Sequence, residues 1–125
     1  MNINLTDFTQ EQRQTLLDLL VLAMYSDRHL ARSENAAIEG VLSAMGLSND
    51  HDRRREMDAS VTRIRPHAEK PEAIRAYVSE LARAFPRRDH RRSVSDLLTE
   101  LMASDSKVAP QEGQFLSLVK ESFYL

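Results

Sequence analysis

Four acidic residues, Asp27, Glu34, Asp105 and Glu112, occur as two Asp–Glu pairs with the same internal spacing. In each pair the Asp follows an apolar segment and the Glu precedes the next one. Oxygen-rich sets of this kind suit hard cations such as Ca²⁺ or Mg²⁺. The D-x-[DN]-x-[DN]-G series of an EF-hand is absent, so any cation site would form by the two pairs converging in the fold.

The two pairs belong to a longer repeat. Residues 18–34 read DLLVLAMYSDRHLARSE and residues 96–112 read DLLTELMASDSKVAPQE, and eight of the seventeen positions are identical at an offset of 78. The identical positions are Asp18/Asp96, Leu19/Leu97, Leu20/Leu98, Met24/Met102, Ser26/Ser104, Asp27/Asp105, Ala31/Ala109 and Glu34/Glu112. The duplication indicates one local structure built twice.

Asp27 and Asp105 continue the apolar stripes of their helices at the C-terminal end, where the helix dipole costs an acid about 0.3–1 kcal/mol. Backbone N–H groups of the following turn could compensate this cost. With Ala31 and Ala109 as N-caps, the two Glu residues would form half of a capping box. Backbone capping, cation binding and an acidic protein-docking surface therefore stay open, and capping is the simplest of the three.

The elements that must position these acids are helical. The 125 residues contain only three Gly and four Pro, and Leu, Ala, Arg and Glu outnumber β-branched residues. Apolar periodicity predicts helices at about 10–26, 32–45, 50–64, 71–85, 87–104 and 110–123. Thr9 and Gln12 have capping-box spacing, Gly46 suits a helix C′ position, and Pro71 and Pro110 suit N1 positions.

These patterns predict a single all-α domain over residues 1–125, a compact bundle of about six to seven helices. The first helix is apolar on nearly every side, so we expect it to be central. The first two and the last two helices form two similar hairpins, which we expect to pack as a pseudo-symmetric core. The third and fourth helices would then connect them.

Charge is unevenly distributed along the chain. Residues 51–92 contain 12 Lys and Arg against 7 Asp and Glu, whereas the flanks contain 5 against 12. The arginine runs 53–55 and 87–92 lack interleaved aromatic residues, and the chain has a net charge of −2, so nucleic-acid binding is not expected. Solvated helix faces, or ion pairs with the acidic flanks, account better for these arginines.

Several function classes are excluded or lack support. The chain has no Cys, which excludes disulfides and thiolate metal sites. The four His residues share no helical i, i+4 pair, and no nucleophile elbow or phosphate-binding Gly loop occurs. No apolar run approaches the ~18 residues of a membrane span and no signal peptide is evident, so we expect a cytoplasmic protein.

The doubled D-x-x-[LV]-x-x-x-E after an apolar helix resembles the TerB-like domains, a family that includes tellurite-resistance proteins and domains of J-domain co-chaperones. The resemblance covers about 20–45 and 94–123, and Arg28 and Ser106 replace the Gly that the family usually carries at the turn. It implies a helical bacterial stress-response or signalling module whose metal-binding acids would be Asp27, Glu34, Asp105 and Glu112.

We therefore expect a non-enzymatic interaction or stress-response module with a protein partner and no catalytic residues. Its only cofactor candidate is a divalent cation, Ca²⁺ or Mg²⁺, held by the paired acids. Two alternatives remain: a metal-dependent hydrolase that uses the same carboxylates, and a structural homo-oligomer, such as a homodimer, without a ligand. The hydrolase would need the acids to converge in a concave pocket.

Overall fold

The computed structural model describes residues 8–26, 33–102 and 110–123, with side chains at 8–23, 38–70, 72–99 and 115–123. Within these segments the chain is all-α, as the composition predicted. The elements are α1 (Gln10–Ser26), α2 (Ser33–Ala44), α3 (Asp50–Ile64), η2 (Arg65–His67), α4 (Pro71–Leu81), η3 (Ala82–Ala84), α5 (Arg88–Met102) and α6 (Pro110–Ser122). The predicted helix at 71–85 is thus α4 followed by a short 3₁₀ turn.

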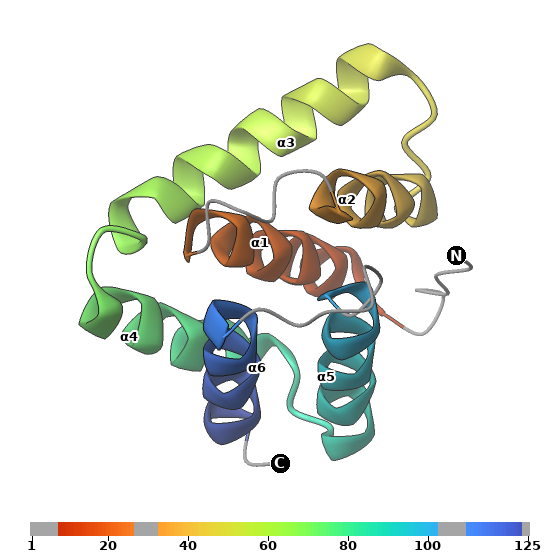
Figure 1. Cartoon of the computed structure of the whole chain (residues 1–125). Helices are drawn as coiled ribbons and strands as arrows, with labels where there is room; N and C mark the ends of the chain where they lie inside the picture. The colour runs from red at the N-terminus through yellow and green to blue at the C-terminus, as the bar shows by residue number, and fades with distance from the viewer. Residues whose placement is uncertain (1–7, 27–32, 103–109, 124–125) are drawn as a thin grey trace.

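The duplication is visible in the helix bounds. α1 begins at Gln10 and α5 at Arg88, while α2 ends at Ala44 and α6 at Ser122, so both limits keep the offset of 78. In each copy the second helix runs back along the first (Figure 1). The repeated sequence therefore forms two antiparallel helical hairpins.

The hairpins meet through their unlike helices. α1, the first helix of one hairpin, contacts α6, the second helix of the other, and α2 contacts α5 in the same way. These two contacts are equivalent under the pseudo-symmetry of the repeat. α1 also contacts α2, α3 and α4 and lies at the centre of the bundle (Figure 1). Its residues Leu16, Leu17 and 19–22 are completely buried, which confirms that the helix with apolar residues on nearly every side is the central one.

α3 and α4 do more than connect the hairpins. α3 packs on α1 and buries Ile64, while α4 packs on α6 and buries Val78 and Leu81. Phe85, just after η3, is also fully buried. The expected connection is therefore part of the core, because each hairpin alone leaves apolar side chains uncovered.

Short-range signals set the ends of three helices. The Thr9 N–H donates to Gln12 Oε1 (2.9 Å) and the Gln12 N–H to Thr9 Oγ1 (3.1 Å), which is the predicted capping box. Gly46 has a φ of +85°, and the N–H groups of Gly46 and Leu47 donate to Ser43 and Leu42 O as in a Schellman motif. Asn49 accepts from the Asp52 N–H (2.8 Å) and caps α3.

No helix in the described segments is both long enough and apolar enough to cross a membrane.

Candidate functional site

The structure places the four sequence-predicted acids only in part. Asp27 and Asp105 lie outside the described residues. Glu34 and Glu112 belong to the first turns of α2 and α6, but their side chains are likewise outside what the structure describes. The cation site formed by these four acids therefore stays a prediction. Among the described side chains, no group of three or more His, Asp or Glu residues is arranged to hold a metal ion.

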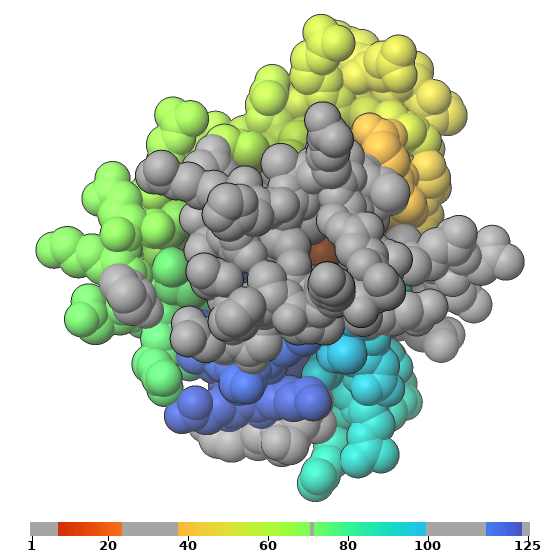
Figure 2. All heavy atoms as spheres, viewed as in Figure 1, coloured from red at the N-terminus to blue at the C-terminus, as the bar shows by residue number. Residues whose placement is uncertain are grey.

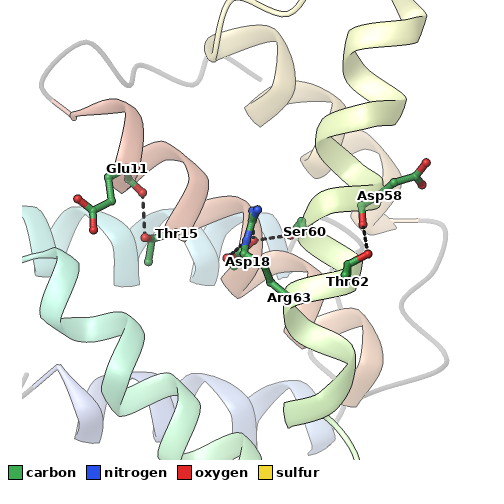
Figure 3. A network of polar contacts seen from close by, with 7 residues as sticks. All are labelled: Glu11, Thr15, Asp18, Asp58, Ser60, Thr62 and Arg63. Atoms are coloured by element: carbon green, nitrogen blue, oxygen red, sulfur yellow. Dashed lines mark hydrogen bonds and ion pairs between the residues drawn. The ribbon is translucent and has the colours of Figure 1, made fainter.

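The most buried polar cluster joins α1 to α3 through Asp18, the first identical residue of the repeat. Asp18 is only 4 % exposed. Its Oδ1 accepts from Ser60 Oγ (2.5 Å) and Arg63 Nη2 (2.9 Å), and its Oδ2 accepts from Arg63 Nε (3.0 Å) (Figure 3). Both carboxylate oxygens are therefore satisfied by α3, as a buried acid requires.

The same cluster influences Tyr77 on α4. Burial raises the pKa of the Tyr77 phenol, and the negative charge of Asp18 raises it further, while Arg63 opposes both effects. The Tyr77 ring stacks on His67, with ring centroids 4.1 Å apart and planes 9° apart. For Arg63, the hydrogen bond to Asp18 raises the guanidinium pKa against the effect of burial. These groups form a structural link between α1, α3 and α4, with both carboxylate oxygens of Asp18 already engaged.

Sequence reasoning missed this cluster, although the sequence around Asp18 contained a signal for it. Asp18 interrupts a helix that is otherwise apolar on nearly every side, and such an acid requires a buried partner. The partner lies 45 residues away on another helix, so spacing along one element could not identify Arg63.

Ion pairs explain part of the arginine-rich middle. Arg63 pairs with Asp18, Arg75 with Glu121 (3.0 Å), and Arg53 with Glu39. Each of these three pairs joins the basic middle to an acidic flank. For Arg53, which belongs to the run 53–55, this confirms the expected ion pairing with the flanks. Arg87 pairs instead with its neighbour Asp89, and Arg54, Arg55 and Arg88 are exposed on helix faces.

The described histidines do not gather. His51 is exposed in the first turn of α3, beside the Asn49 cap. His67 stacks on Tyr77, whereas His90 lies edge-on to Phe8 with ring centroids 5.0 Å apart.

A groove of about 380 Å³ lies between α4 and α6, and we name it the arginine groove. It is lined by Arg75, Ser79, Ala82, Arg83, Arg91, Glu121 and Ser122. Patterns along a single element could not indicate this groove, because its residues come from α4, η3, α5 and α6. A second hollow of about 450 Å³ lies on α5 and is lined by Arg88, Asp89, Arg92, Ser93 and Asp96.

Basic side chains therefore occupy separate parts of the surface. α3, with the exposed Arg54 and Arg55, forms one edge of the molecule, and α5 and α6 form the opposite edge (Figure 2). The residues that line the arginine groove belong to α4, η3, α5 and α6. Figure 1 shows α3 above α1, and α4, α5 and α6 below it.

Comparison with family models, with curated proteins and with solved structures found no match for this chain.

Proposed function

We propose that this chain is a non-enzymatic interaction module of the TerB-like type that responds to a divalent cation. The observation that carries the proposal is the constant offset of the two hairpins. Each Asp–Glu pair spans the junction between the two helices of its hairpin, and Glu34 and Glu112 occupy the first turns of α2 and α6. A cation bound at either junction would bias the angle between two helices, which is a physical means of signalling to a protein partner.

Catalysis by the repeated acids would require a second feature. An enzyme needs its acids to converge in a concave pocket that also holds a substrate. The two described hollows are lined mainly by arginine and serine, and the acids that line them are Asp89, Asp96 and Glu121. Asp27, Glu34, Asp105 and Glu112 lie outside the described side chains, so a hydrolase that uses them stays the second candidate.

The test is titration of Ca²⁺ and Mg²⁺ into the full chain, followed by calorimetry and by NMR of the backbone amides. Asp27→Asn/Asp105→Asn removes the proposed ligands, and Glu72→Gln/Glu80→Gln removes two exposed acids of α4 as a matched control. Saturable shifts confined to the two junctions, lost in the first variant and kept in the second, support the proposal. If cations leave the wild type unchanged while the Asp variant loses stability, the acids cap backbone and the cation function is wrong.

A further inference from the structure

The arginine groove has the composition of an oxyanion site. Three arginines, Arg75, Arg83 and Arg91, line the groove together with one carboxylate, Glu121. Ser79 and Ser122 add two hydroxyl groups whose oxygens lie 3.4 Å apart, one from α4 and one from α6. Arginine forks and hydroxyl donors are the groups that recognise phosphate oxygens.

Arg91 is fixed before any ligand arrives. Its Nε donates to Phe85 O (2.5 Å) and its Nη1 approaches Phe123 O at 3.5 Å, and the side chain is half-buried. The two carbonyl groups hold the guanidinium at the wall of the groove. A donor that is already ordered loses little conformational entropy when an anion binds.

The other two arginines have exposed side chains that can turn toward a ligand. Arg83 is exposed and has no recorded partner among the described residues. Arg75 pairs with Glu121, but both side chains are more than 60 % exposed, and an exposed pair of this kind is weak. Glu121 and the C-terminal ends of α4 and α6 oppose an anion, so binding depends on the arginines that line the groove.

We propose that the arginine groove binds a phosphate group, supplied either as inorganic phosphate or as the monoester of a small molecule. A phosphate carries about −1.5 to −2 charges at neutral pH and is therefore attracted by the arginines that line the groove. The volume of about 380 Å³ lies at the low end of small-molecule clefts and leaves space beyond the anion itself. The site shares no residue with the proposed cation junctions, so either proposal can fail alone.

The test uses the full chain and two probes, inorganic phosphate and glycerol 3-phosphate, at constant ionic strength, with glycerol as a blank. Binding is followed by NMR through the amides of Ser79, Arg83 and Ser122. Arg83→Ala removes an exposed arginine of the groove and should weaken binding about tenfold. Arg54→Ala is the matched control, because it removes one exposed arginine from α3.

Saturable shifts at the groove that weaken in Arg83→Ala and persist in Arg54→Ala support the proposal. Tighter binding of glycerol 3-phosphate then identifies a phosphate ester as the ligand class, and equal binding identifies inorganic phosphate. The proposal is overturned if neither probe gives saturable shifts at the groove. It is also overturned if both variants weaken binding equally, since that reports only the net charge of the surface.

Discussion

Leu20 in α1 and Leu98 in α5 are both fully buried, but the aspartates two residues earlier in the same helices differ completely. Asp18 is buried and bound by Ser60 and Arg63. Asp96 is exposed, lines the hollow on α5 and has no recorded partner among the described residues. Identical local sequence has therefore produced two environments, because α3 covers this face of α1.

The two hairpins are alike in the residues that they contribute to the common core. Residues at an offset of 78 are buried in both copies at Leu16/Val94, Leu20/Leu98, Ile38/Leu116, Val41/Val119 and Met45/Phe123. The matching burial extends beyond the segment in which the sequence identity was evident. The repeat therefore determines the hairpin and its buried inner face, whereas α3 and α4, between the two copies, determine what covers the outer face.

The largest expected effect tests the shared core. Leu20→Ala and Leu98→Ala should each lower the free energy of unfolding by about 3 kcal/mol, because both remove a fully buried side chain and leave a cavity. Urea unfolding followed by circular dichroism measures the loss. A cost below about 1 kcal/mol for Leu98→Ala alone would show that the second hairpin is not packed like the first.

The second-largest effect tests the difference in burial between Asp18 and Asp96. Asp18→Ala should cost about 2 kcal/mol, because Ser60 and Arg63 lose their buried acceptor. Asp96→Ala should change stability by less than about 0.5 kcal/mol, as expected of an exposed side chain without partners. Urea unfolding compares the two, and the Asp18→Ala/Arg63→Ala double-mutant cycle measures how much of the cost is the pair itself. Equal losses at both positions would remove the distinction between the copies.

Sequence reasoning predicted what depends on neighbours along the chain. Thr9 with Gln12, Gly46 and Pro71 set helix ends within a few residues, and apolar periodicity identified α1 as central. It could not predict the Asp18–Arg63 pair or the arginine groove, because these join residues that only packing brings together. The groove shows this most clearly: Arg75 and Glu121 are 46 positions apart and meet only because α4 packs on α6.

Helix capping gives a smaller difference between the copies. Thr9 caps α1 with a full capping box, whereas the equivalent residue in front of α5 is Arg87, which pairs with Asp89 instead. Thr9→Ala should cost about 1 kcal/mol, and Thr9→Ser should retain most of the stability. Arg87→Ser should raise stability by a few tenths of a kcal/mol, since the new hydroxyl can cap α5. Thermal and urea unfolding detect both changes, and a loss in Arg87→Ser would mean that the Arg87–Asp89 pair outweighs a cap.

The smallest expected effect concerns Tyr77, which senses the buried carboxylate of the first copy. Burial first, and the charge of Asp18 second, raise the pKa of the phenol above its ordinary value of about 10. A pKa that is higher in the folded state means that the neutral phenol contributes stability below pH ~10, and this contribution is lost as the pH rises through the folded pKa. Tyr77→Phe should therefore flatten the loss of stability in alkali.

Absorbance titration of tyrosinate, as the difference between each protein and its Tyr77→Phe variant, isolates this residue from the other two tyrosines. Asp18→Asn should lower the Tyr77 pKa toward its ordinary value, because the second-largest of the causes that raise it is removed, while burial and the charge of Glu80 remain. Asp96→Asn should leave it unchanged, since Asp96 makes no recorded contribution to the shift. If the two variants moved the pKa of Tyr77 equally, the carboxylate that it senses would not be the buried one. The electrostatic difference between the two copies would then be lost, even though their difference in burial remained.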